Sequence, residues 1–286
     1  MKLALGTVQF GLKYGLGNTK GKVSKDEVSE ILSIAKSIGI NTLDTAINYG
    51  CSEKVLGEIG IRDWRIVSKL PNIGPDILNI QEWIAAEVES SAIRLNVESL
   101  TGVLLHHSEN LLGERGAEVY IALQNLKKRG LVEKIGVSIY SPDELTLLDA
   151  FNLDIVQAPL NVFDKRFVLS GWAKKLKDSG VEIHTRSSFL QGLLLMDKNN
   201  RPNKFNVWGD VWRKWDEWLK SRGISPVQAC ISYPLSISEV DCVLIGVDSV
   251  AHLEEIVANS SKEVLDYPDF GNLDLRLIEP SRWKYL

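Results

Sequence analysis

Eight short runs of apolar and β-branched residues recur along this chain of 286 residues. Most are continuously apolar rather than alternating, as strands buried on both faces are. Strands separated by helical segments predict an α/β fold, here a single-domain (β/α)8 TIM barrel over residues 1–286. A doubly wound sheet, for which fewer strands are expected, is the main alternative. The runs are LALGTV (3–8), INTLDT (40–45), WRIVSKL (64–70), LTGVLLH (100–106), EKIGVSI (133–139), LDIVQAP (153–159), GVEIHTR (180–186) and VDCVLIG (240–246).

The segments between these runs carry the periodicity of amphipathic helices. In residues 24–39 the apolar residues fall on one stripe, and Ser24 with Glu27 fits a capping box. The same spacing occurs in residues 79–96, 116–130 and 141–151. Residues 190–208 are expected to form a long loop, and an irregular tail is expected from about residue 265. Long loops at the carboxyl end of a barrel usually shape the substrate entrance.

The tryptophan-rich stretch 207–220 also has helical spacing. Trp208, Trp212 and Trp215 fall on one stripe, which predicts a helix packed against the barrel. The alternative places Trp208 over the pocket as a platform for a sugar or another ring.

Composition and charge exclude several classes of function. The formal net charge is −4, so no basic surface invites nucleic acid. No apolar stretch approaches the length of a membrane span, and the apolar run among the first residues is too short for a signal peptide. The three cysteines have no CxxC spacing, which favours a reducing compartment over a disulfide framework. We therefore expect a cytoplasmic protein with a small-molecule partner, and its oligomeric state stays open.

Ionisable residues gather where the second, third and fourth predicted strands end, which is where barrels carry their chemistry. Asp44 ends the second strand, Tyr49 lies in the loop after it, Lys69 ends the third, and His106 and His107 end the fourth. A charge at the end of a buried strand is costly unless it is paired. Asp44 is therefore expected to neutralise Lys69, with the ammonium reaching the Tyr49 hydroxyl.

This arrangement suits reduction of a carbonyl group. A cation beside the phenol of Tyr49 favours its deprotonated form, which helps it to transfer a proton near neutral pH. A neighbouring histidine would orient the carbonyl and share the developing negative charge. No side chain can supply a hydride, so a cofactor is required.

Each of these residues alone has a simpler explanation. A single Asp at a strand end is often a turn residue, and Lys69 alone could be a snorkelling surface residue. Lys69 could also form a Schiff base in a barrel aldolase, which leaves Tyr49 without a role. A metal site built from Asp44, His106, His107 and His184 is a further alternative, but no HxH or HExxH spacing supports it, so we predict no metal.

Two motifs resemble those of the aldo-keto reductase family, and the resemblance covers nearly the whole chain. DTAINYGCSEKVLG (44–57) is similar to the family's Asp-Thr-Ala-x-x-Tyr-Gly-x-Ser-Glu-x-x-Leu-Gly motif, and LLHHSE (104–109) is similar to the segment that carries its histidine. The resemblance implies NAD(P)H-dependent reduction of an aldehyde or ketone, such as a sugar or sugar derivative. The implied catalytic residues are Asp44, Tyr49, Lys69 and His106, with Tyr49 as proton donor. A cofactor-bearing binding or regulatory barrel with little turnover is the alternative.

The resemblance also implies a set of cofactor-binding residues. Ile139 replaces an Asn of the family pattern, and Arg186 replaces an aromatic residue that stacks on the nicotinamide. A guanidinium plane can still stack, or it could meet an anionic substrate. Asp248 disfavours a 2′-phosphate, whereas the family pattern favours NADP(H), so NADP(H) and NAD(H) both stay open. The implied residues are Gly6, Thr7, Asp44, Ser138, Gln157, Arg186, Ser187, Phe189, Gln191, Gly192, Gly246, Asp248, Ser249 and His252.

Overall fold

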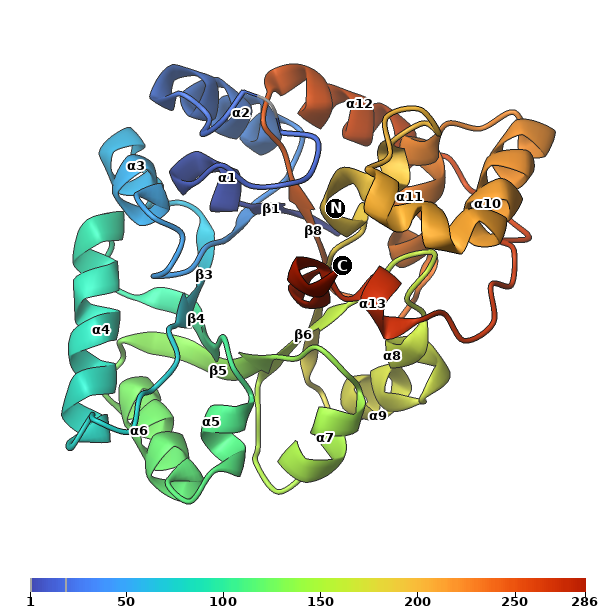
Figure 1. Ribbon diagram of the computed structural model, residues 1–286. Coiled ribbons are helices and arrows are strands. Elements are labelled where there is room, and N and C mark those ends of the chain that lie inside the picture. The colour runs from blue at the N-terminus through green and yellow to red at the C-terminus, as the bar shows by residue number, and fades with distance from the viewer. Residues whose placement is uncertain (1, 19) are drawn as a thin grey trace.

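Eight parallel strands close into a barrel in which each strand pairs with its neighbours in sequence order, and β8 pairs with β1 (Figure 1). The computed structural model describes residues 2–18 and 20–286. Each of the eight apolar runs forms one strand, so the predicted (β/α)8 barrel is confirmed. The strands are β1 (Leu3–Gly6), β2 (Thr42–Asp44), β3 (Arg65–Leu70), β4 (Leu100–Leu105), β5 (Val132–Ser138), β6 (Ile155–Pro159), β7 (Glu182–Arg186) and β8 (Cys242–Gly246).

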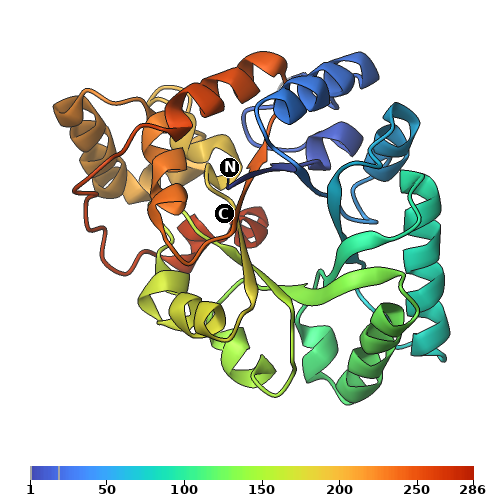
Figure 2. The same cartoon turned by 180° about the vertical axis from the view of Figure 1, so that it is seen from behind.

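Helices surround the ring of strands, as the two opposite views show (Figures 1 and 2). They are α1 (Val8–Gly11), α2 (Lys25–Ser37), α3 (Ser52–Ile59), α4 (Ile80–Leu95), α5 (Glu109–Leu112), α6 (Gly116–Lys128), α7 (Asp143–Leu148), α8 (Arg166–Leu169), α9 (Trp172–Asp178), α10 (Gly209–Arg222), α11 (Pro226–Ser236), α12 (Val250–Ser260) and α13 (Leu275–Ile278). The helices predicted at residues 24–39, 79–96, 116–130 and 141–151 form within these ranges and end one to three residues earlier, whereas α10, predicted from residues 207–220, continues to Arg222. Within the described residues no helix combines the length and apolar character that a membrane crossing needs.

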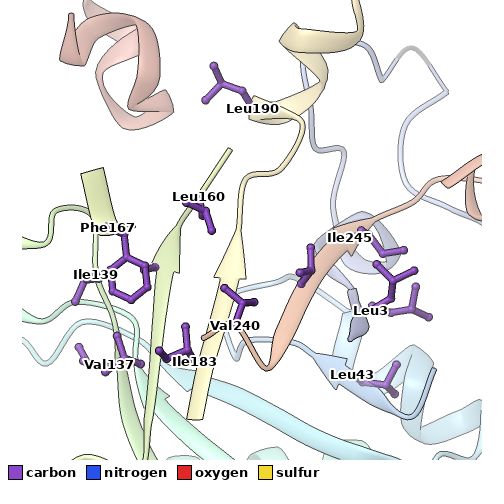
Figure 3. Close-up of a cluster of buried hydrophobic side chains, with 14 of the residues drawn as sticks. Leu3, Leu43, Val137, Ile139, Leu160, Phe167, Ile183, Leu190, Val240 and Ile245 are labelled. Carbon is purple, nitrogen blue, oxygen red and sulfur yellow. The ribbon is translucent and has the colours of Figure 1, made fainter. Parts of the chain in front are cut away.

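Alternation along the strands separates the main core, which strands and helices share, from a smaller apolar layer inside the barrel. Side chains such as Leu43, Val137 and Ile183 are buried in the main core (Figure 3), and each contributes about 1.5–3 kcal/mol of transfer free energy. On β3, Val67 packs with residues of β4 and β6 in a separate apolar cluster. Lys69 lies two residues further along, so its side chain leaves β3 on the same side as that of Val67. This periodicity of two places a charged group directly above an apolar layer inside the barrel.

The segment 190–208 contains regular secondary structure where a long loop was expected. It contains two 3-10 helices, η1 (Leu190–Leu195) and η2 (Asn203–Trp208), which bury Leu190, Leu193 and Phe205. The helix α10 that follows buries Trp212 and Trp215, as the stripe predicted. Trp208 lies against Phe205, with ring centroids 6.1 Å apart, and is not part of the cavity described below.

The tail expected to be irregular contains α13 and a third 3-10 helix, η3 (Pro280–Tyr285). Its Glu279 accepts a hydrogen bond from Arg166, and Arg166 also donates to the carbonyl of Tyr140, just after β5. The indole of Trp283 packs on Phe205, with ring centroids 5.0 Å apart. These contacts hold the tail at the carboxyl end of the barrel, where Figure 1 shows it.

Candidate active site

Asp44 and Lys69 form a buried ion pair at the carboxyl end of the barrel. The Lys69 ammonium donates to Asp44 Oδ1 at 2.5 Å and to the carbonyl of Thr45 at 2.9 Å. Gln157 Nε2 donates to the other carboxylate oxygen at 2.8 Å. Burial lowers the pKa of Lys69, but the Asp44 carboxylate and the Tyr49 phenol outweigh it, so the pKa lies above its ordinary value. Lys69 therefore stays charged, as the sequence predicted.

Tyr49 lies beside this pair in the loop between β2 and α3. The Lys69 ammonium is 5.2 Å from the centroid of the Tyr49 ring. The backbone of this loop lies very close to α1. A Cβ built on Gly11 would lie only 1.7 Å from the Tyr49 carbonyl oxygen. Glycine at position 11 therefore permits the close backbone approach that positions the phenol.

His106 faces Tyr49 edge to face. Their ring centroids are 6.0 Å apart, and the rings are inclined at 79°. Burial, and then the charge of Lys69, lowers the pKa of His106 to about 3. His106 is therefore neutral at physiological pH, and one ring nitrogen can donate a hydrogen bond to a substrate carbonyl.

A cavity of about 560 Å³ opens at this end of the barrel and joins these groups to the residues expected to hold a cofactor. Asp44, Tyr49 and His106 line it, whereas Lys69 is buried beneath it. Among the expected cofactor residues, Ser138 and Ser249 do not reach its wall. Those that do are Gly6, Thr7, Asp44, Gln157, Arg186, Ser187, Phe189, Gln191, Gly192, Gly246, Asp248 and His252.

Two wall residues outside the predicted set, Gln9 and Ser188, carry polar atoms that are buried and unpartnered within the described part of the chain. These atoms are Gln9 Oε1 and Ser188 Oγ. A buried polar atom without a protein partner is uncommon, and a bound ligand can supply the missing hydrogen bond. Gln9, Tyr140 and Ser188 come one or two residues after predicted strands, so their position in the sequence could have indicated the site, although their residue types did not. Tyr14, which also lines the cavity, lies six residues after the first predicted strand and had no such signal.

The backbone after β7 is bent through left-handed conformations. The φ angles are +67° at Ser187, +48° at Leu190 and +54° at Gln191, followed by +88° at Gly192. Non-glycine residues in this region each cost on the order of 1 kcal/mol. The Gln191 carbonyl accepts from the amide of Leu16 at 3.0 Å, which ties this loop to the segment after β1. The bend places Phe189 and Gln191 on the cavity wall.

Two acidic side chains occupy the start of α12. Ser249 caps the helix by accepting from the amide of His252 at 3.3 Å, and Asp248 pairs with the His252 ring. The amide of Val250 donates to Glu27 Oε1 at 2.7 Å. The capping box predicted for Ser24 and Glu27 therefore forms only in part: Ser24 Oγ accepts from the Glu27 amide, but the Glu27 carboxylate bonds to α12 instead.

The alternative metal site is not assembled at the cavity. His184 does not line it; its Nε2 is bonded to Glu182 at 2.9 Å. Glu182, His184 and Cys242 do lie close enough to share an ion. However, Glu182 already accepts hydrogen bonds from Arg65 and Lys134, and a metal ion would have to compete with both cations.

The chain belongs to the aldo/keto reductase family, whose profile matches residues 2–275. It is 26% identical to L-galactose dehydrogenase of Arabidopsis thaliana over 273 residues, covering 90% of this chain and 84% of that protein. It is also 26% identical to D-arabinose 1-dehydrogenase of Saccharomyces cerevisiae over 193 residues, covering 61% and 58% of the two chains. An aldo-keto reductase of Bacillus halodurans, solved in its holo form, has the same fold, with a TM-score of 0.75, 21% identity, and coverage of 93% and 88%. The protein is therefore a carbonyl-reducing oxidoreductase of a family that uses nicotinamide cofactors.

Proposed function

We propose that the protein reduces an aldehyde or ketone, such as a sugar or sugar derivative, to an alcohol with NAD(P)H, and that Tyr49 donates the proton. The observation that carries the proposal is the placement of Tyr49 between the buried Asp44–Lys69 pair and a neutral His106. Neutral His106 orients the carbonyl oxygen, and Tyr49 protonates it as Lys69 stabilises the phenolate left behind. A reduced nicotinamide, when bound, supplies the hydride.

The cavity suits such a cofactor. Its volume of about 560 Å³ falls within the range of small-molecule sites. Gln9 Oε1 and Ser188 Oγ, which have no hydrogen-bond partner among the described residues, lie on its wall and could bond to a cofactor. In this proposal Ser138 acts indirectly, because its hydroxyl lies 3.5 Å from Gln157 Oε1 and can orient that amide. Ser249 likewise shapes the start of α12 rather than lining the cavity.

The Schiff-base aldolase is less well supported. A lysine that attacks a carbonyl has to be neutral and within reach of the substrate. Lys69 is 1% exposed, has a raised pKa and donates to two oxygens.

The three cysteines are free, which accords with a reducing compartment such as the cytoplasm.

We expect the purified protein to consume reduced nicotinamide cofactor in the presence of aldehydes or keto-sugars. A panel of both carbonyl classes, followed by cofactor absorbance with NADPH and with NADH, measures this directly. Tight cofactor binding without turnover on any member of the panel would favour the binding barrel. A borohydride-trapped adduct on Lys69 would favour the aldolase.

We also propose that NAD(H) is preferred over NADP(H). Asp248 and Glu255 line the cavity at α12, and Glu27 already accepts the Val250 amide at the start of this helix. A helix N-terminus is where a phosphate would otherwise be stabilised. Carboxylates at this position repel a 2′-phosphate but can accept hydrogen bonds from a ribose diol.

Replacing Asp248 with arginine is expected to tighten NADPH relative to NADH. Reversal of a close charge changes the difference in binding free energy by about 1–3 kcal/mol. Quenching of the fluorescence of the eight tryptophans reports both dissociation constants. The matched control is Glu254→Arg on the same helix, because Glu254 is exposed and outside the cavity. An equal effect of both substitutions, or none from either, would show that Asp248 does not face the ribose.

A further inference from the structure

Arg186 is a cation on the cavity wall that forms no ion pair with a carboxylate in the described part of the chain. Its Nη2 donates to the carbonyl of Ile139 at 2.9 Å, and its Nη1 donates to Ser187 Oγ at 3.3 Å. Both acceptors are uncharged. A guanidinium has five N–H donors, so donors remain for a ligand.

The guanidinium is also held in a defined orientation. Its central carbon lies 4.7 Å from the centroid of the Tyr140 ring, and Tyr140 lines the same cavity. The backbone carbonyl of Arg186 accepts from the amide of Leu160 at 3.0 Å, which anchors the residue at the end of β7. A half-buried charge that is packed in place but not neutralised is costly unless a ligand compensates it.

The charges around the cavity are unevenly distributed. Near Tyr49, the charges of Asp44 and Lys69 cancel, so Arg186 leaves this part of the cavity positive. Arg186 and His106 line the same cavity, and the charge of Arg186 adds to burial and to the charges of Lys69 and His107 in lowering the pKa of His106. The carboxylates of Asp248 and Glu255 lie at α12 instead. The charge therefore favours an anionic group near the reacting carbonyl.

We propose that the substrates carry a carboxylate or phosphate group and that Arg186 binds it. The planar fork of a guanidinium matches either group through paired, charge-assisted hydrogen bonds. This inference rests on the proposed carbonyl reduction and narrows its substrate to anionic aldehydes or ketones. It also gives Arg186 a role that the aromatic residue of the family pattern could not perform.

Two pairs of substrates test the inference, since the members of each pair share the aldehyde and differ in whether they carry the anionic group. One pair is 4-carboxybenzaldehyde and methyl 4-formylbenzoate, and the other is glyceraldehyde 3-phosphate and glyceraldehyde. We expect the wild type to have a higher kcat/KM for the anion in at least one pair. Arg186→Gln should lower that anion-to-neutral ratio at least about tenfold, because a charged hydrogen bond contributes about 1.5–3 kcal/mol. Arg186→Lys should restore part of the ratio, and the pair that responds identifies carboxylate or phosphate.

A control and a binding measurement separate this inference from the proposed function. Lys13→Gln removes an exposed cation outside the cavity and should leave the ratio unchanged. Tryptophan fluorescence follows binding of the alcohol product 4-(hydroxymethyl)benzoate, or of glycerol 3-phosphate, without turnover. Loss of this binding in Arg186→Gln supports the anion site even if no aldehyde is reduced, an outcome that contradicts only the proposed function. Turnover with an unchanged ratio, or a variant that weakens cofactor binding and both members of a pair equally, would overturn the inference.

Discussion

Replacement of Tyr49 by phenylalanine is expected to lower kcat at least about a hundredfold while cofactor binding persists. The substitution removes the hydroxyl but keeps the aromatic ring, which lies 5.2 Å from the Lys69 ammonium and packs edge to face with His106. General acid catalysis contributes about 10²–10⁴-fold to the rate, so loss of the proposed proton donor should remove most of that factor. Single-turnover and steady-state rates with a saturating aldehyde measure the loss, and fluorescence titration checks the cofactor.

A second tyrosine in the cavity makes this prediction specific. Tyr14 also lines the wall, and its hydroxyl accepts from Gln191 Nε2 at 3.2 Å. Burial raises the pKa of Tyr14 above its ordinary value, and, in contrast to Tyr49, no lysine ammonium lies over its ring in the part of the chain that the structure describes. Tyr120 lies outside the cavity, and its hydroxyl donates to the carbonyl of Asn152. Tyr120→Phe therefore controls for the loss of a tyrosine hydroxyl in general. Near-normal turnover in Tyr49→Phe together with a large loss in Tyr14→Phe would assign the donor to Tyr14.

Lys69→Met is expected to reduce both turnover and stability. The substitution removes the cation that stabilises the Tyr49 phenolate, so the rate should fall about a hundredfold and its dependence on pH should change. It also leaves the Asp44 carboxylate, which is 3% exposed, without its ionic partner. Breaking a buried pair in this way typically costs about 3–5 kcal/mol of unfolding free energy. Denaturant unfolding and pH–rate profiles measure the two effects separately.

The double variant Asp44→Asn/Lys69→Met distinguishes the catalytic role of Lys69 from its structural role. Removing both charges should recover much of the stability lost in the single variant, because no uncompensated charge stays buried. Turnover should stay low, since the phenol still lacks its cation. Recovery of turnover along with stability would instead show that Lys69 acts only as the structural partner of Asp44.

Local patterns in the sequence were sufficient to predict the barrel and the group of residues around Tyr49. Continuous apolar runs reveal buried strands, and a strand's period of two places Lys69 on the same side as Val67. Asp44, Lys69 and His106 end consecutive strands, and a parallel barrel brings such ends together at one face. Because the charge of Asp44 had to be paired, its contact with Lys69 could be anticipated before the geometry was known.

Contacts between distant segments required the tertiary structure. Gln157 reaches Asp44 across 113 positions in the sequence, and Glu27 reaches Val250 across 223. The residue type of Glu27 and its spacing from Ser24 also fit a local capping box. The sequence around Glu27 therefore could not indicate that its carboxylate reaches α12 instead. The stacking of Arg186 on Tyr140 likewise depends on how β5 and β7 approach each other. The sequence by itself determined where the eight strands lie, to within two residues at their carboxyl ends, because the apolar runs that form buried strands are local features of the chain. Closure of the barrel decided which polar groups meet, because each buried group takes the partner that the packed chain brings within hydrogen-bonding distance.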